Sequence, residues 1–240
     1  MSGKIFIGTS GWHYKHWRGL FYPTDLPTSE WLKFYAQHFK TVELNNSFYR
    51  LPTTASFETW REVSPSGFVF AVKGSRFTTH MKKLKDPKPS TDKFFDAAVH
   101  LRSKLGPILF QLPPHWRVDK HRLEEFLEAM PKSHQYTFEF RDDSWLNEGI
   151  YEVLERHNAA LCIHDLGGRQ SPIELTANFT YIRFHGPTEF RYAGSYSQDV
   201  LEGWAERFKK WKLKSTYAYF NNDIGGHAPR NASTLIKLLG

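Results

Sequence analysis

The sequence has little of what anchors a protein in a membrane or stabilises it outside a reducing compartment. Its one cysteine, Cys162, excludes an internal disulfide, and the apolar residues around it favour a buried, unreactive thiol. No run of about eighteen apolar residues occurs, which argues against a membrane-spanning helix. The first eight residues contain too short an apolar stretch for a secretory signal. We therefore expect a cytoplasmic protein with no membrane partner.

The composition is that of a folded globular protein. The 240 residues include 40% hydrophobic and 24% charged residues, and aromatic residues reach 16%. This length suits one α/β barrel, so we expect residues 1–240 to form a single domain. The formal net charge of +7 favours anionic partners, either small molecules or nucleic acid.

Short β-rich runs recur along the chain, and amphipathic helical patterns separate most of them. Asp119 and Ser197 are good N-cap residues for two of these helices. Strands that alternate with helices pair in parallel through right-handed crossovers. The expected strands are Lys4–Gly8, Thr41–Asn45, Phe68–Gly74, Pro107–Leu112, Tyr136–Arg141, Ala160–Asp165, Tyr181–His185 and Thr216–Asn221.

Eight such units predict an α/β fold, a (β/α)8 barrel of the triosephosphate-isomerase type. The connection between the sixth and seventh strands is the irregular one. Only residues 171–177, with a proline, are available there, so we expect one helical turn or none.

Strand alternation indicates which side chains point into the barrel. In the second strand, Val42 and Leu44 occupy one face, so Glu43 and Asn45 occupy the other. Active sites of such barrels lie at the C-terminal ends of the strands. The same reasoning at each strand end, with the start of the loop after the first strand, predicts a polar site made of Ser10, Trp12, Glu43, Asn45, Lys73, Gln111, Glu139, Arg141, Arg183, His185 and Asn221.

Buried charges cost several kcal/mol each unless they are paired or hydrated, so this cluster indicates a polar ligand. The alternative is a structural network of ion pairs that closes the top of the barrel. Glu139–Arg183 and Glu43–Lys73 are the pairs that such a network would contain.

The order of several motifs also resembles the YecE-like family, known as domain of unknown function 72. The resemblance covers almost the whole chain and implies a closed βα barrel without an agreed activity. One departure is Asp142, where the family commonly has a histidine, and it weakens any role that requires an imidazole there. The matching segments are residues 8–23 (GTSGWHYKHWRGLFYP), 42–52, 68–80, 108–116, 139–145, 183–197 and 219–232.

The first hypothesis for function is an enzyme that acts on a phosphate-bearing or otherwise anionic substrate, such as a nucleotide or a nucleic-acid backbone. Either Glu43 or Glu139 would act as base, and His185 would act as acid. Lys73, Arg141 and Arg183 would hold the anion, and Asn45, Gln111 and Asn221 would orient the substrate.

Two loops supply further candidates for substrate binding. Gly225 and Gly226 stand just before the last helix, where barrels often bind phosphate through backbone N–H groups. The alternative for each glycine is a turn that needs a positive φ. Tyr192 and Tyr196 lie in the long loop after the seventh strand, and we expect them to face a ligand.

Three other chemistries remain open. A non-catalytic module would grip nucleic acid through its basic rim. A metal-dependent phosphodiester hydrolase, similar to endonuclease IV at the level of fold, would draw on His164 and Asp165 as ligands, although a core histidine is the simpler interpretation of His164. A Schiff-base lysine would have to be Lys73, and carboxylates beside it would keep it charged. We expect no cofactor, and a divalent metal only under the hydrolase hypothesis; the oligomeric state stays open.

Overall fold

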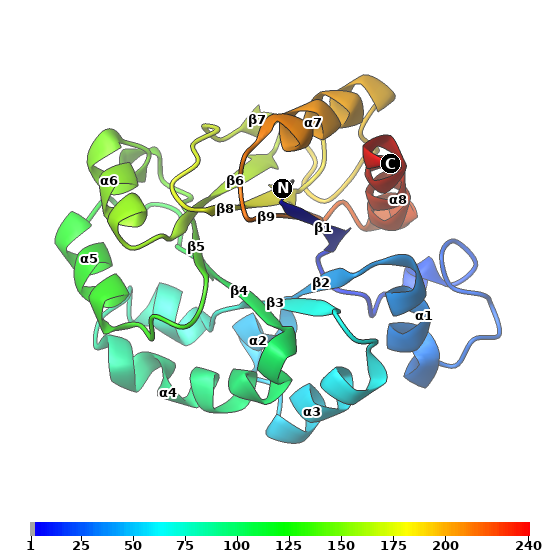
Figure 1. Cartoon of the computed structure of the whole chain (residues 1–240), viewed down its shortest axis with the longest axis horizontal. Coiled ribbons are helices and arrows are strands. Elements are labelled where there is room, and N and C mark those ends of the chain that lie inside the picture. Colours follow the sequence, from blue (N-terminus) through cyan, green and yellow to red (C-terminus); the bar gives the residue numbers. More distant parts are fainter. Residues whose placement is uncertain (1–2) are drawn as a thin grey trace.

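The computed structural model describes residues 3–240 and shows eight parallel strands with helices around them (Figure 1). The strand neighbours follow the order β1-β9-β8-β6-β5-β4-β3-β2. Each strand lies within three residues of its predicted bounds. The strands are β1 (Lys4–Thr9), β2 (Thr41–Leu44), β3 (Val69–Lys73), β4 (Leu105–Gln111), β5 (Tyr136–Glu139), β6 (Ala160–Leu166), β8 (Phe179–Phe184) and β9 (Ser215–Phe220).

Eight α-helices of the described residues follow the strands, and their apolar faces pack on the outside of the barrel. The predicted caps are confirmed: the Asp119 carboxylate accepts from the Arg122 N–H at 3.0 Å, and the Ser197 hydroxyl accepts from the Val200 N–H at 3.4 Å. The helices are α1 (Trp31–His38), α2 (Asn46–Tyr49), α3 (Thr54–Val63), α4 (Pro87–Ala98), α5 (Lys120–Ala129), α6 (Glu148–Arg156), α7 (Gln198–Lys210) and α8 (His227–Leu239).

The irregular connection falls where the sequence predicts it. No helix joins β6 to β8; instead the chain turns back and forms β7 (Arg169–Gln170), which pairs antiparallel with the end of β6. Asp165 faces Gln170 in this short hairpin.

The barrel closes between β1 and β2, where a tyrosine supplements the backbone bonds. The Gly11 N–H donates to the Glu43 carbonyl at 2.8 Å. The Tyr35 hydroxyl accepts from the Thr9 N–H at 2.9 Å and donates to the Thr41 carbonyl at 3.0 Å. Gly8 is required at this seam, because a Cβ there would lie 2.2 Å from the Thr41 carbonyl oxygen.

The interior of the barrel changes character along its axis. Aromatic rings fill the middle and lower part, where Phe6 stacks on Tyr217 at 5.1 Å and Tyr181 lies 5.0 Å from Tyr219. The inward positions nearer the C-terminal ends carry charged and amide side chains. Within residues 3–240, no helix is both long and apolar enough to cross a bilayer.

Candidate functional site

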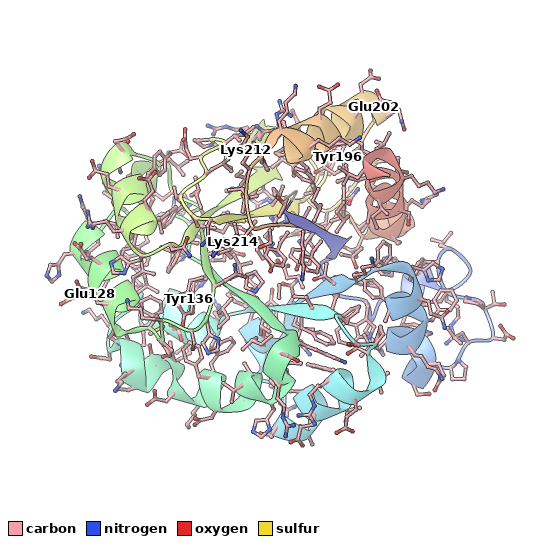
Figure 2. All side chains as sticks on the ribbon, viewed as in Figure 1. Glu128, Tyr136, Tyr196, Glu202, Lys212 and Lys214 are labelled. Atoms are coloured by element: carbon pink, nitrogen blue, oxygen red, sulfur yellow. The ribbon has the colours of Figure 1, made fainter. Side chains whose placement is uncertain are left out.

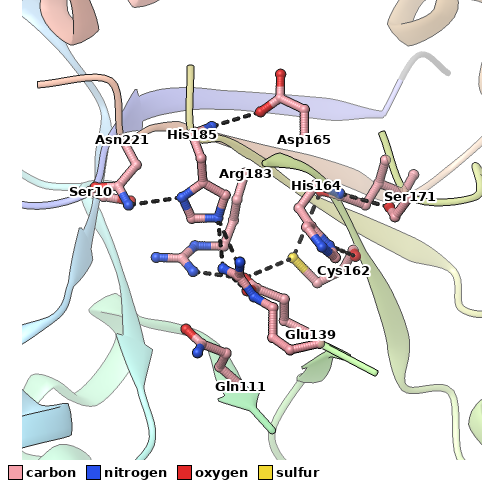
Figure 3. Close-up of polar contacts among 12 residues, drawn as sticks. Ser10, Gln111, Glu139, Cys162, His164, Asp165, Ser171, Arg183, His185 and Asn221 are labelled. Carbon is pink, nitrogen blue, oxygen red and sulfur yellow. Dashed lines mark hydrogen bonds and ion pairs between the residues drawn. The ribbon is translucent and has the colours of Figure 1, made fainter. Parts of the chain in front are cut away.

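A buried arginine joins two buried glutamates at the centre of the polar layer. Figure 3 shows its pairing with one of them, Glu139. Arg183 on β8 donates from one terminal nitrogen to Glu43 Oε1 at 2.7 Å and from the other to Glu139 Oε2 at 2.6 Å. Both glutamates are fully buried, and Arg183 is 1% exposed. The alternation of β2, β5 and β8 therefore directs these three side chains into the barrel, as predicted from the sequence.

Further hydrogen-bond donors replace the water that the two carboxylates lose on burial. Ser10 and Tyr181 each donate to Glu43 at 2.6 Å, and Arg141 donates to Glu139 through Nε. Burial alone would raise the pKa of both glutamates, but the arginines and these hydrogen bonds outweigh it and hold both pKa values below 4.5. Both carboxylates are therefore ionised and weakly basic, which argues against either as the general base.

This network contains one of the two ion pairs expected from the sequence. The expected Glu139–Arg183 pair is present, but the Glu43–Lys73 pair is absent, because Glu43 takes the other end of the Arg183 guanidinium. The two terminal nitrogens of a guanidinium lie far enough apart for Arg183 to bind one carboxylate on each side. The partner of Lys73 is then a different group.

Lys73, at the end of β3, directly contacts two uncharged side chains. Its Nζ donates to Gln111 Oε1 at 2.7 Å and sits 4.1 Å from the centre of the Phe48 ring. Burial is the main cause that lowers the pKa of Lys73 to about 8, and the positive charge of Arg183 lowers it further against the opposing effect of the two glutamates. At neutral pH an appreciable part of this amine is unprotonated.

His185, after β8, is held neutral. Burial and the charge of Arg183 lower its pKa to about 3, so the ring carries one N–H. Nη2 of Arg141 lies 3.2 Å from Nε2, and Nδ2 of the Asn221 amide lies 3.0 Å from Nδ1. Both neighbours are donors, and a neutral imidazole accepts from only one of them. The role of general acid expected for His185 does not fit a neutral imidazole, whereas hydrogen bonding to a substrate does.

Three neighbouring strands present donors that have no protein acceptor. Lys73 uses one of its three N–H groups on Gln111; among the described residues, no hydrogen bond engages the Gln111 amide nitrogen or Nη1 of Arg141. When Lys73 is protonated, it forms with Arg141 and Arg183 three cations against the two carboxylates, which leaves one net positive charge in this layer. His164 adds no charge, because burial lowers its pKa. The mouth of the barrel is therefore suited to an anion.

An aromatic cleft of about 400 Å³ lies beside this mouth, between the loops after β1 and β2. Trp12, Tyr14 and Trp60 line it together with Asn45, whose buried Oδ1 has no partner in the described residues. Trp12 meets Trp60 edge to face at 5.4 Å. The cleft offers ring faces and an amide acceptor next to the charged layer.

A second cleft of about 340 Å³ opens under the β6–β7 hairpin. Arg141 and His164 lie on its inner side, and Gln170 and Ser171 come from the hairpin. Arg141 can therefore be reached from this cleft. His164 itself lies 3.3 Å from the Cys162 carbonyl through Nδ1, in keeping with a core histidine.

The two tyrosines of the loop after β8 have different surroundings. Tyr192 is 38% exposed and its ring lies 5.7 Å from that of His185, which keeps it a candidate for ligand contact. Tyr196 is buried beside α7 and α8 (Figure 2), donates to Asp165 and accepts from the Gly186 N–H at 2.8 Å. The expectation that Tyr196 faces a ligand was wrong, because its hydroxyl fixes the loop to β6.

The glycine pair before α8 does not form the expected anion cradle. Gly225 and Gly226 have φ values of 71° and 66°, which satisfies the alternative of a turn. Their carbonyl oxygens accept from Arg230, the Gly226 N–H donates to the Asp223 carbonyl, and Leu20 packs over Gly226. The start of α8 is thereby covered by the loop after β1.

The weak metal candidates have other partners. Asp165 accepts from the His185 backbone N–H at 2.7 Å as well as from Tyr196, and burial raises its pKa to about 6. In residues 3–240 no three histidine, cysteine, aspartate or glutamate side chains gather in a metal-binding arrangement. Asp165 positions the loop that carries His185.

Sequence reasoning missed two residues of the site. Tyr181, which bonds Glu43, follows from the same alternation that places Arg183 inside, so the signal was available. Phe48, which covers Lys73, belongs to the four-residue helix α2, and nothing in the sequence pattern marks it.

The arrangement can now be compared with known proteins. Residues 6–240 match the family model described as protein of unknown function DUF72. The UPF0759 protein YunF of Bacillus subtilis is 29% identical, with 98% of this chain and 94% of the relative aligned, and YecE of Escherichia coli K12 is 23% identical, with 96% and 91% aligned. A solved DUF72 protein of Thermotoga maritima has a TM-score of 0.87 and 31% identity over 98% of this chain and 99% of that one.

More distant structures share only the fold. A D-psicose 3-epimerase of Clostridium cellulolyticum has a TM-score of 0.53 at 9% identity, with 98% of each chain covered. The parallel eight-stranded barrel, the motifs at its strand ends and the match over residues 6–240 lead to one conclusion. The chain belongs to the DUF72 family.

Proposed function

We propose that this protein is an enzyme whose small substrate carries a carboxylate or phosphate group, held at the barrel mouth by Arg141 with Lys73 and Gln111. The unused donors of these three side chains carry the proposal. Charge-assisted hydrogen bonds to an anion contribute about 1.5–3 kcal/mol each. The adjacent carboxylates of Glu43 and Glu139 do not oppose an anion strongly, since Arg183 and Arg141 neutralise them.

Arg183, the third cation expected to hold the anion, has a structural role in this proposal. Both of its terminal nitrogens are engaged by glutamates and its side chain is 2% exposed. The group best suited to exchange a proton near neutral pH is Lys73, with a pKa of about 8. Asn45, Asn221 and neutral His185 would orient the rest of the substrate.

Calorimetric titration of a panel of small anions tests the proposal. The panel contains sugar phosphates, nucleoside monophosphates and 2-oxo acids, each with an uncharged analogue. We expect a class of anion to bind the native protein and to bind Arg141→Gln about tenfold or more weakly, the equivalent of losing one charge-assisted hydrogen bond. The matched control is Arg156→Gln, because Arg156 pairs with Glu124 on the protein surface.

The nucleic-acid module is the outcome that would replace this proposal. Its support is the loop after β3, where Phe77 is 43% exposed among Arg76, Lys82 and Lys83. Binding to a single-stranded oligonucleotide would then fall steeply with salt and would be unaffected by Arg141→Gln. That result, without binding of any small anion, would contradict the proposal that this protein is an enzyme acting on a small anion.

A further inference from the structure

Lys73 differs from the other cations of the polar layer in having no carboxylate partner. Among residues 3–240, no carboxylate oxygen lies within 4.0 Å of its Nζ, whereas Arg141 and Arg183 both pair with glutamates. Its contacts are a neutral amide oxygen and the face of an aromatic ring. The residue as a whole is 8% exposed, so Lys73 is buried with a small exposed part.

The charges around Lys73 come from four sides of the barrel. Arg183 and Arg141 disfavour an ammonium there, and the two carboxylates that would favour it are already held by these arginines. His80, in the loop after β3, has its pKa lowered to about 4 by burial and nearby cations, so it is neutral. The groups that act on Lys73 are Glu43 from β2, His80 from the β3 loop, Glu139 and Arg141 from the end of β5, and Arg183 from β8.

A lysine whose pKa is lowered by burial and by nearby cations is an activated nucleophile. The two carboxylates that favour a charged Lys73 are present in the barrel, but burial and the charge of Arg183, which pairs with both of them, outweigh their effect on its pKa. Burial and Arg183 together bring the pKa of the amine to about 8.

We propose that the ε-amine of Lys73 forms an imine with the carbonyl carbon of the substrate. This inference rests on the proposed function and narrows its substrate class to an aldehyde or ketone that also carries a carboxylate or phosphate. The anionic group lies on Arg141 and the Gln111 amide nitrogen, and the carbonyl carbon lies at Nζ of Lys73. The aromatic cleft beside Asn45 takes the remainder of the molecule.

The step balances without an added oxidant or reductant. The lone pair of the neutral amine bonds to the carbonyl carbon, and the C=O π electrons move to the oxygen. A proton passes from the nitrogen to that oxygen through water, which gives a neutral carbinolamine. The hydroxyl takes a second proton from solvent and leaves as water with the C–O electrons, while the nitrogen lone pair forms the C=N bond of the protonated imine. Its positive charge withdraws electrons from the neighbouring carbon, which acidifies a C–H bond or weakens a C–C bond there.

Reductive trapping on the whole native protein tests this inference. Glyoxylate is an aldehyde with a carboxylate, and glycolaldehyde is an uncharged aldehyde with the same number of carbons. Each is incubated with the protein and sodium cyanoborohydride at pH 7, and peptide mass mapping then finds the modified lysines. We expect Lys73 to be modified first, with glyoxylate about tenfold faster than glycolaldehyde because of the contact with Arg141.

Lys104 is the matched internal control. Burial also lowers its pKa, but its Nζ donates to the Arg61 and Ser64 carbonyls and to the Ser64 hydroxyl at 2.5, 2.6 and 2.9 Å, and it lies outside the barrel. We expect no preferential modification there. Lys73→Arg keeps the cation but cannot form an imine, and we expect it to abolish the fast modification.

The outcomes separate the two proposals. Equal rates for the two aldehydes at Lys73, unchanged by Arg141→Gln, would support the imine and overturn the anion site. Modification of surface lysines or Lys104 ahead of Lys73 would overturn the imine. The calorimetric titration would then decide separately whether the anion site exists. The order in which the lysines are modified is measured on the native protein, so poor folding of a variant does not affect the test of the imine.

Discussion

Replacement of Arg183 by methionine removes the one cation that Glu43 and Glu139 share. Methionine fills a similar length of side chain but provides no donor, so two fully buried carboxylates lose 2.7 and 2.6 Å hydrogen bonds. Loss of one partner of a buried ion pair costs about 3–5 kcal/mol. Typical domains are stable by about 5–15 kcal/mol, so we expect a folded variant with greatly reduced stability.

The pH dependence of this loss gives the sharper test. In the native protein both glutamate pKa values lie below 4.5, so their stabilising contribution is complete above pH 4.5 and is lost as the pH falls through the folded values. Without Arg183, Glu43 has no cation partner, so burial dominates and raises its folded pKa above 4.5, whereas Arg141 still lowers the pKa of Glu139. The variant then loses stability as the pH rises from 4.5 towards the folded pKa of Glu43, by about 1.4 kcal/mol per pH unit for this one proton.

Urea unfolding followed by tryptophan fluorescence at pH 5 and pH 7 measures both effects. We expect the difference in unfolding free energy between the native protein and Arg183→Met to be smaller at pH 5 than at pH 7, by about 1 kcal/mol or more. Asp165 also titrates in this range, with a pKa of about 6, but it is common to both proteins. Arg156→Met, which breaks an exposed pair with Glu124, controls for loss of an arginine and should cost about 1 kcal/mol or less. A cost for Arg183→Met below about 1 kcal/mol, or the same cost at both pH values, would refute this reasoning.

Three further predictions concern single groups. Tyr196→Phe should lower the unfolding free energy by about 1–3 kcal/mol, because the buried Gly186 N–H loses its acceptor, and should leave anion affinity unchanged in calorimetry. Tyr35→Phe should cost about 1–3 kcal/mol in urea unfolding, since the Thr9 N–H at the barrel seam loses its acceptor; an effect below 0.5 kcal/mol would count against the seam. The rate of glyoxylate trapping at Lys73 should rise with pH up to about 8 and then level off, as the neutral amine becomes the main form; a rise that continues to pH 10 would contradict the lowered pKa.

Much of the barrel was predictable because alternation is a local property. The run TVEL fixes the side on which Glu43 lies, and YIRF does the same for Arg183, whatever the distant strands do. Eight such runs with helices between them leave few topologies open. The same logic located Lys73 and Gln111 inside the barrel.

The choice of partners inside the barrel was not predictable in this way. Glu43 pairs with Arg183 instead of Lys73 because a long guanidinium reaches two carboxylates across the barrel, and side-chain reach is not encoded in strand alternation. Tyr196 turned away from the mouth because Asp165 captures its hydroxyl, a contact between residues 31 positions apart. Loop conformation depends on such distant contacts, so the roles expected for loop residues were the least accurate.

The most direct test of the account is a crystal structure of the native protein soaked with glyoxylate. We expect the carboxylate within hydrogen-bond distance of Arg141 and the Gln111 amide, with the former carbonyl carbon bonded to Nζ of Lys73 and the Glu43–Arg183–Glu139 ion pairs intact. Glyoxylate bound elsewhere while the mouth holds only water, or a carboxylate on Arg183 with both glutamates displaced, would contradict it.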